Sequence, residues 1–266
     1  MTSDLTKIES LFTYPLKGFS AQAVTSAVLK NAAGFPGDRQ WGFAKPGDAV
    51  DPLIPQSMVK NRFYVLLKHE KLAELQSHYD AASQRLVLRH HGKVVLDHSL
   101  SSSSAAAVVT EFIGDFLNLS PHERPVLAHA GAHQFTDSAA SSLEMRGAWR
   151  KDSVSLVGLE SVADLASKSG RAVDPLRFRG NIYFTGFTPF AELDWLGREI
   201  RIGTARLRVF ERTVRCKATE VDPRTGLRDL PTVKLLQDHY GHADMGIYAM
   251  VEEGGVIKPG DELVLV

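Results

Sequence analysis

The sequence predicts a mixed, β-rich α/β fold in which many short strands form a barrel-like arrangement. Short alternating or β-branched runs recur along the 266 residues, whereas few stretches have helical spacing. The last third has the clearest pattern, because apolar Ile200 and Ile202 alternate there with charged Glu199 and Arg201. Many short strands with few helices are typical of barrels.

In the first third, strands alternate with two helical stretches. His91 and Gly92 supply turn residues between two apolar runs and predict a hairpin. Helical spacing over residues 69–79 places Leu72, Leu75 and Tyr79 on one side, and serines cap a second helix over 101–119. The expected strands lie in residues 9–18, 22–29, 34–44 and 85–98.

Proline and glycine punctuate residues 120–135, which predicts a domain boundary there. We expect one domain over residues 1–120 and a second over 121–266. The second domain begins with a strand and a helix that opens near Ser161. It continues with a hairpin over 196–210, a short helix that ends at Gly241, and two final strands.

Composition excludes several classes of protein. The chain has 31 basic and 31 acidic residues, which argues against nucleic acid or a membrane surface as the main partner. A single cysteine makes neither an internal disulfide nor an iron–sulfur cluster. No signal peptide and no apolar spanning run are present, so the expected location is the cytoplasm.

That single cysteine, Cys216, lies between Arg215 and Lys217, just after an alternating strand. Neighbouring cations favour the thiolate, which is a nucleophile and a ligand for soft metals. Asp222 and Gly226 follow in a tight turn, where the aspartate can cap the loop backbone. The alternative is that Cys216 is a buried, inert residue.

Five segments along the chain carry a recognisable order of motifs. They are "YPLKG" at 14–18, "GDRQWGF" at 37–43, "HQFTDSA" at 133–139, "RFRGNIYFTG" with "DWLGREIRIG" at 177–203, and "RCKATEVDPRTG" with the C-terminal strands. In this order they resemble the MOSC domain family and its N-terminal β-barrel domain, in the branch that contains the mitochondrial amidoxime-reducing component and its bacterial relatives. The resemblance implies a MOSC β-barrel with a smaller N-terminal β-barrel-like domain.

The resemblance implies that Cys216 ligates the molybdenum of a pterin cofactor. The implied cofactor-binding residues are Lys17, Arg39, Arg177, Arg179, Asn181, Arg215 and Asp222. Arginine forks suit phosphate oxygens and the polar pterin edge. Alternation predicts a strand at 177–179 with both arginines on one face. Two alternatives stay open: Lys17 is a solvated turn lysine, and Arg39 pairs with Asp38 at the surface.

The function that the resemblance implies is reduction of N-hydroxylated or N-oxide small molecules by a molybdenum-cofactor oxidoreductase. Separate flavin, iron–sulfur or haem proteins would supply electrons. The alternative is a sulfur carrier that uses a Cys216 persulfide, and a third reading is a cofactor-binding module without turnover. Pyridoxal phosphate binding is a further family-level association. Gly18 departs from relatives that often carry a hydroxyl residue after the lysine.

Overall fold

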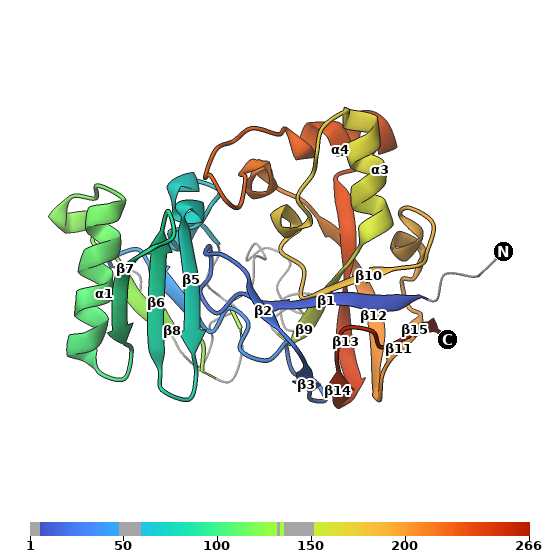
Figure 1. The fold of residues 1–266 in the computed structure, drawn as a ribbon, viewed down its shortest axis with the longest axis horizontal. Coiled ribbons are helices and arrows are strands. Elements are labelled where there is room, and N and C mark those ends of the chain that lie inside the picture. Colours follow the sequence, from blue (N-terminus) through green and yellow to red (C-terminus); the bar gives the residue numbers. More distant parts are fainter. Residues whose placement is uncertain (1–5, 48–59, 132–133, 136–151) are drawn as a thin grey trace.

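The computed structural model describes residues 6–47, 60–131, 134–135 and 152–266. Figure 1 shows a large sheet with helices α3 and α4 on one side of the molecule, and α1 beside a smaller sheet at the other end. The segment at 133–139 that resembles the family lies mostly outside the described residues. None of the described helices has the length and apolarity needed to cross a membrane.

The large sheet contains eight strands, and all neighbours in it are antiparallel except β9 and β10. The parallel pair is connected through helix α3 (Leu159–Ser169), as parallel neighbours require a crossover. In spatial order the strands are β15 (Leu263–Leu265), β11 (Glu199–Ile202), β12 (Ala205–Val214), β13 (Asp244–Glu253), β9 (Ser153–Gly158), β10 (Ile182–Thr185), β1 (Lys7–Thr13) and β2 (Gln22–Val24).

The two ends of this sheet approach each other near the chain termini. Lys7 forms an isolated bridge with Glu262, and the Ile8 amide donates to the Asp261 carbonyl at 2.8 Å. The strand order itself still ends at β15 and β2. The β-rich α/β class is therefore confirmed, whereas full closure into a barrel stays a prediction.

Smaller sheets complete the β structure. Strands β6 and β7 form the predicted hairpin, in which His91 and Gly92 take the positive φ values of 49° and 77° that a two-residue turn requires. The strands are β3 (Ala27–Leu29) with β14 (Gly255–Ile257), β4 (Trp41–Ala44) with β8 (Val126–His129), and β5 (Leu75–Asp80), β6 (Arg85–His90) and β7 (Lys93–Ser99) in one sheet.

The helices begin and end largely where capping residues predict. The Ser102 hydroxyl accepts a hydrogen bond from the Ala105 amide at the start of α1 (Ser103–Phe116). Helix α4 (Thr232–Tyr240) ends at Gly241 with φ 76°, whereas α3 begins two residues before Ser161. The 3-10 helices are η2 (Lys60–Arg62), η3 (Glu70–Glu74), η4 (Pro121–Glu123), η6 (Pro175–Phe178), η7 (Ala191–Asp194) and η8 (Lys217–Glu220).

Two local predictions are wrong. The expected helix over residues 69–79 is η3 followed by strand β5, because residues from Leu75 onward pair with β6. The expected strand at 177–179 is the end of η6, and Arg179 has φ 52° in the left-handed region. A bend at this position separates Arg177 from Arg179, so alternation does not describe their directions.

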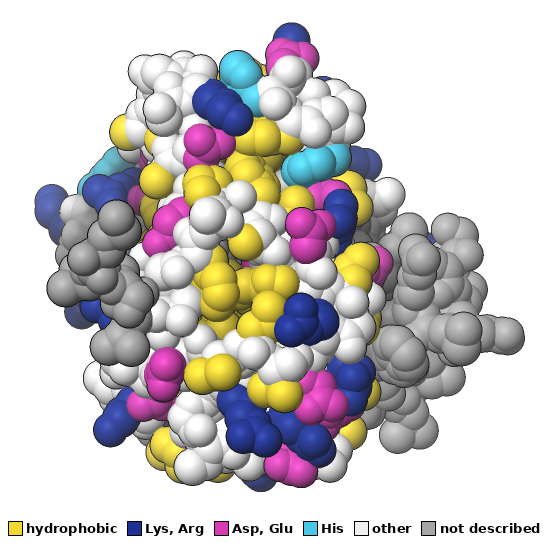
Figure 2. All heavy atoms as spheres, turned by 90° about the vertical axis from the view of Figure 1, so that its right-hand side faces the viewer, with side chains coloured by type: hydrophobic (Ala, Val, Ile, Leu, Met, Phe, Trp, Pro, Cys, Tyr) yellow, Lys and Arg dark blue, Asp and Glu magenta, His cyan; other side chains and the backbone are white. Residues whose placement is uncertain are grey.

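Strand pairing links the two parts of the chain. Strands β1 and β2 extend the sheet built from C-terminal strands, and β3 pairs with β14. Strand β8, just after the expected boundary, pairs with β4. The domain division at residue 120 stays a prediction. On the surface in Figure 2, charged side chains of both signs surround a group of hydrophobic ones.

Candidate functional site

Cys216 lies in the wall of a small pocket with three of the predicted cationic residues. The pocket has a volume of about 30 Å³, and the cysteine is partly exposed. Segments far apart in the sequence meet here, since the lining residues span positions 17 to 218. They are Lys17, Gly18, Arg39, Val65, Leu66, Leu67, Arg179, Cys216 and Ala218.

The cysteine sits where strand β12 gives way to η8. Its carbonyl accepts hydrogen bonds from the Thr219 amide at 3.0 Å and the Thr219 hydroxyl at 2.9 Å. The Thr219 and Thr232 hydroxyl oxygens lie 2.5 Å apart, which ties this turn to the start of α4. Buried hydrogen bonds of this kind hold the thiol at a defined place.

Lys17 is almost fully buried, with 2% of its surface exposed. Its amide donates to the Trp41 carbonyl at 2.8 Å, and its Nζ lies 5.7 Å from the centroid of the Phe63 ring. The reading of Lys17 as a solvated turn lysine is therefore wrong. The cation–π contact and the pocket both keep its ammonium group inside the protein.

Gly18 lines the same pocket in a backbone conformation that favours glycine. Its φ is 88°, and a Cβ atom at this position would lie 3.0 Å from the Val65 Cα. Any L side chain would be strained here and would contact the backbone of Val65. Glycine therefore lets the chain approach Val65 closely at the wall of the pocket.

Arg39 pairs with the neighbouring Asp38, as the open alternative suggested, but this pair is not at the surface. Asp38 is 1% exposed and also accepts the Tyr14 amide at 2.8 Å. The second Arg39 nitrogen, Nη2, donates to the Arg179 carbonyl at 3.1 Å. Arg39 still lines the pocket that contains Cys216, so it pairs with Asp38 and contributes to the site at the same time.

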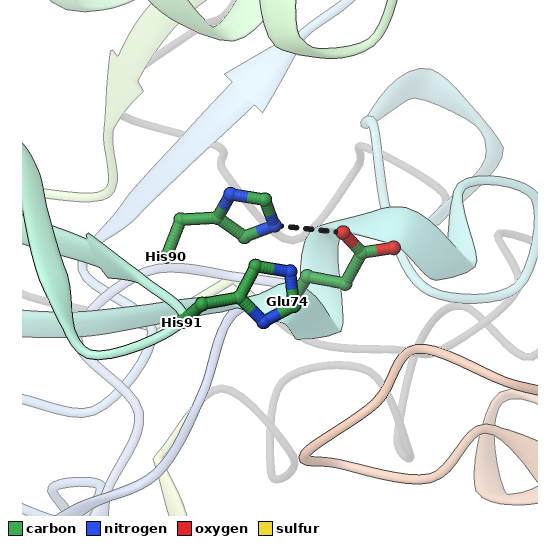
Figure 3. Close-up of side chains that lie close together, drawn as sticks. All are labelled: Glu74, His90 and His91. Atoms are coloured by element: carbon green, nitrogen blue, oxygen red, sulfur yellow. Dashed lines mark hydrogen bonds and ion pairs between the residues drawn. The ribbon is translucent and has the colours of Figure 1, made fainter.

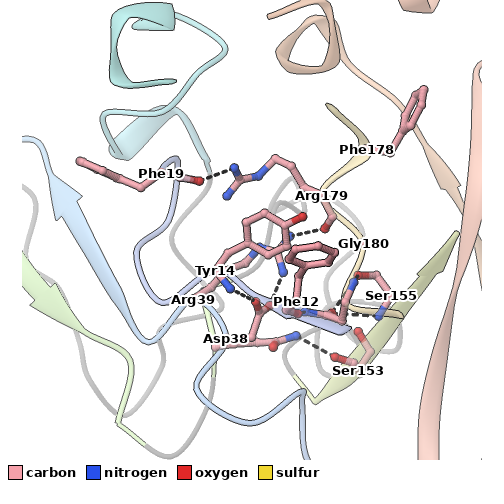
Figure 4. Close-up of polar contacts among 12 residues, drawn as sticks. Phe12, Tyr14, Phe19, Asp38, Arg39, Ser153, Ser155, Phe178, Arg179 and Gly180 are labelled. Carbon is pink, nitrogen blue, oxygen red and sulfur yellow. Dashed lines mark hydrogen bonds and ion pairs between the residues drawn. The ribbon is translucent and has the colours of Figure 1, made fainter. Parts of the chain in front are cut away.

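The aromatic ring of Tyr14 organises both pocket arginines. The guanidinium carbon of Arg179 lies 4.4 Å from the ring centroid and that of Arg39 lies 5.2 Å away, and Arg179 also donates to the Phe19 carbonyl (Figure 4). Burial raises the pKa of Tyr14 well above its ordinary value. The ring is therefore a neutral platform that holds two cations near each other.

A larger cavity of about 340 Å³ adjoins the small pocket and shares Leu66 and Arg179 with it. This volume is within the usual range for ligand pockets, about 300–1,000 Å³. Its lining mixes apolar side chains with hydroxyl, amide and guanidinium groups. The lining residues are Tyr14, Phe19, Ser20, Ala21, Leu66, Ala73, Gln76, Ser77, Leu176, Arg179, Pro223 and Arg224.

Arg177 and Asp222 form an ion pair beside the pocket and do not line it. Arg177 Nη2 lies 3.1 Å from Asp222 Oδ2 and 2.7 Å from Asp229 Oδ1, and the arginine side chain is 3% exposed. Asp222 also caps its turn, because its Oδ1 accepts the Arg224 and Thr225 amides. Both residues therefore shape the loop behind Cys216.

Arg215 and Asn181 also form hydrogen bonds with other segments of the chain and do not line the pocket. Arg215 donates from Nε to the Met245 carbonyl and from Nη1 to the Phe178 carbonyl, both at 2.8 Å. Asn181 accepts from the Ser155 hydroxyl at 2.8 Å and donates to the Phe12 carbonyl. The structure thus brings Lys17, Arg39 and Arg179 to Cys216, but leaves these two residues outside the pocket lining.

Sequence reasoning missed the aromatic and apolar walls of the site. Tyr14 is part of the "YPLKG" segment that contains Lys17, so its position in this segment could have identified it as a residue of the site. The sequence did not identify Leu66 and Leu67 as pocket residues, because an apolar run indicates a buried core whether or not it also lines a pocket.

Comparison with known proteins identifies one family and several relatives. The MOSC domain matches residues 129–264. Mitochondrial amidoxime-reducing component 1 of Mus musculus is 33% identical over 146 residues, which are 47% of this chain and 42% of the mouse protein. Its Homo sapiens counterpart is 31% identical over 172 residues, which are 58% of this chain and 50% of that protein. The chain spans about half the length of these curated relatives.

Two solved structures are also similar. YiiM from Geobacillus stearothermophilus is 30% identical, with a TM-score of 0.34, over 42% of this chain and 53% of its own. The YUAD protein from Bacillus subtilis is 14% identical, with a TM-score of 0.43, over 98% of this chain and 94% of its own.

Proposed function

Because this chain belongs to the MOSC domain family, we propose that it is a molybdenum-cofactor-binding oxidoreductase. Its substrates would be small N-hydroxylated or N-oxide molecules, and separate redox proteins would supply the electrons. The names of the curated relatives, amidoxime-reducing components, support this reaction class. The observation that carries the proposal is that Cys216 shares one pocket with Lys17, Arg39 and Arg179.

The residues of the pocket fit such a cofactor. A thiol is a suitable donor for molybdenum, and buried cations suit an anionic, phosphate-bearing group. The small pocket alone is too narrow for a pterin, but the adjoining 340 Å³ cavity adds the space. In this proposal Cys216 is the protein ligand, and Lys17, Arg39 and Arg179 hold the phosphate and the pterin edge.

When bound, the cofactor would supply the two-electron chemistry of N–O reduction. The protein's own contribution is binding and electrostatics. Tyr14 fixes the direction of Arg39 and Arg179, and Asp38 fixes Arg39 from the other side. Leu66 and Leu67 form an apolar wall that limits water near the thiol.

A sulfur carrier is a second candidate, and the size of the small pocket favours it. A volume of about 30 Å³ suits one or two water-sized groups, and a single sulfur atom bonded to Cys216 is of that size. The same cations would stabilise a persulfide anion. A persulfide is released by mild thiol reductants, whereas a bound pterin is not, which separates the two candidates.

The decisive experiment is elemental analysis for molybdenum on protein purified from a host that makes the cofactor. The Cys216→Ser variant is measured beside the wild type. We expect near-stoichiometric metal in the wild type and little in the variant. Reduction of a model amidoxime with a chemical electron donor then tests the reaction class.

Absence of molybdenum from the wild-type protein, despite a competent host, would overturn the oxidoreductase proposal. Sulfur that is released from the wild type by dithiothreitol, and is missing in Cys216→Ser, would then support the carrier. Metal that persists in Cys216→Ser would contradict the ligand role of the thiol while leaving cofactor binding intact.

A further inference from the structure

Three potential metal ligands converge at the turn of the β6–β7 hairpin, outside the lining of the pocket at Cys216. The ligand atoms of Glu74, His90 and His91 all lie within 4.8 Å of one another. His90 Nε2 lies 2.9 Å from Glu74 Oε2, and the centroids of the two imidazole rings are 4.0 Å apart (Figure 3). No other such group occurs among the described residues.

The fold itself brings these side chains together. Leu75 pairs with His90 at the start of the β5–β6 ladder, so Glu74, one residue earlier, lies beside the hairpin turn. His91 has φ 49° because it occupies a two-residue turn, and its ring centroid lies 4.0 Å from that of His90. The site is therefore built from a strand register and a turn, both of which fix backbone positions.

The surroundings are partly desolvated. The side chains of His90 and Glu74 are 28% and 25% exposed, and the Phe116 ring meets that of His90 edge-on at 5.4 Å. A Cβ atom at Gly226 would lie 3.1 Å from Glu74 Cγ, so the turn that follows Cys216 packs directly on this carboxylate side chain. Partial burial strengthens electrostatic attraction at the site.

We propose that Glu74, His90 and His91 bind a divalent transition-metal ion of the zinc class. Two imidazoles and one carboxylate are ligands that zinc, copper and nickel accept, whereas magnesium and calcium prefer oxygen alone. Three protein ligands leave one tetrahedral position for water. Bonds of about 2.0–2.2 Å require the ligand atoms to come closer than 4.8 Å, which rotation of the exposed His91 side chain allows.

The ion would fasten the hairpin turn to η3 and so to the Gly226 turn. This role does not depend on the proposed oxidoreductase activity. Because the ion binds the folded state, it should raise the thermal midpoint of unfolding. A plain ion pair between Glu74 and His90 would also explain the 2.9 Å contact, and the experiment must distinguish the two.

The test is calorimetric titration of tag-free, full-length protein with Zn²⁺, and visible spectroscopy with Co²⁺. The variants are His91→Asn, which tolerates a positive φ, and Glu74→Gln; His122→Ala is the matched control, because His122 is exposed and lies outside the cluster. The Cys216→Ser variant shows whether any of the bound zinc is held by the thiol. We expect one equivalent of saturable binding, weakened about tenfold or more in His91→Asn and Glu74→Gln.

Binding should be unchanged in His122→Ala and Cys216→Ser, and Zn²⁺ should raise the unfolding temperature of both. Equal affinity in His91→Asn and wild type would overturn the proposal, as would binding that disappears in Cys216→Ser. If the wild-type protein shows no saturable binding of Zn²⁺, Glu74 and His90 form an ion pair only.

Discussion

Arg179 connects the small pocket at Cys216 with the larger cavity beside it. Its guanidinium contacts the Tyr14 ring, donates to the Phe19 carbonyl and lines both spaces. The left-handed backbone at this residue, with φ 52°, turns the side chain away from the Arg177 ion pairs. A single backbone conformation thus separates a pocket arginine from a structural one.

Replacing Arg179 by alanine should weaken cofactor binding about tenfold or more and so lower the molybdenum content, since a charged hydrogen bond to an anion contributes about 1.5–3 kcal/mol. Elemental analysis after purification from the same host measures this. Arg201→Ala is the matched control, because Arg201 is exposed on β11 and lines neither space. Equal metal in both variants would argue against a role for Arg179 in holding the cofactor.

The resemblance to a family predicted several residues that lie together in the structure, but it did not predict which partners each of them has. Cys216, Lys17, Arg39 and Arg179 come together as one pocket, although they are far apart in sequence. Arg177 drew equal attention but pairs with Asp229, 52 residues away. Local patterns do not reveal partners at that distance, so the sequence could not separate the two arginines.

At the scale of elements, α3 and η7 are joined through a buried carboxylate. Glu192 is 1% exposed, and both of its oxygens accept the Ser161 hydroxyl at 2.9 Å. A Cβ atom at Gly158, just before α3, would lie 3.1 Å from Glu192 Oε1, so this carboxylate also packs on the helix start. Burial is the main cause that raises the pKa of Glu192 above its usual value.

This shift makes the stability of the protein depend on pH. A carboxyl group whose pKa is higher in the folded state binds protons more tightly when folded, so stability falls as pH rises through that range. We expect the free energy of unfolding of wild type, relative to Glu192→Gln, to decrease from about pH 4.3 upward. Urea unfolding at a series of pH values measures the difference.

Glu111→Gln is the control, because the Glu111 side chain is 65% exposed. Its curve should run parallel to that of wild type across the whole series. If the Glu192→Gln curve were also parallel, the carboxyl group would not be coupled to folding. The comparison uses only the slope of the free energy of unfolding against pH. A change in stability that the glutamine side chain causes equally at every pH therefore does not affect it.

Elements with explicit end signals were predictable. Ser102 and Gly241 mark a helix start and a helix end, and His91 with Gly92 marks the hairpin turn. The prediction of a helix over residues 69–79 was wrong because Leu72 and Leu75 suit both the face of a helix and the start of a strand. Tertiary pairing with β6 decided in favour of the strand, and periodicity in a short run does not contain that information.

At the scale of the whole molecule, Arg228 ties the loop behind Cys216 to the N-terminal half. Its Nη2 donates to the Leu66 and Leu67 carbonyls at 2.7 and 2.8 Å, and its Nη1 donates to the Lys217 carbonyl at 2.6 Å. Leu66 and Leu67 form the apolar wall of the pocket. One side chain therefore holds the two halves of the site at a fixed separation.

Replacing Arg228 by alanine should leave three carbonyls without their donor. The bond to the Leu66 carbonyl is partly buried, whereas the bonds to Leu67 and Lys217 are exposed and water can replace them. Losing one partly buried hydrogen bond costs about 0.5–1.5 kcal/mol, so we expect a loss of that order in the free energy of unfolding. Chemical denaturation of the purified protein measures it. Arg89→Ala is the matched control, because Arg89 is exposed on β6 and lies outside the pocket.

The same variant tests whether the site depends on contact between the halves. If the Arg228 bridge is what holds the pocket wall at Leu66 in place relative to Cys216, molybdenum retention should fall in Arg228→Ala and stay normal in Arg89→Ala. Arg228→Lys should recover only part of the effect, since one ammonium group does not span carbonyls on both segments. Full retention in a destabilised Arg228→Ala protein would mean that each half keeps its part of the site without this bridge.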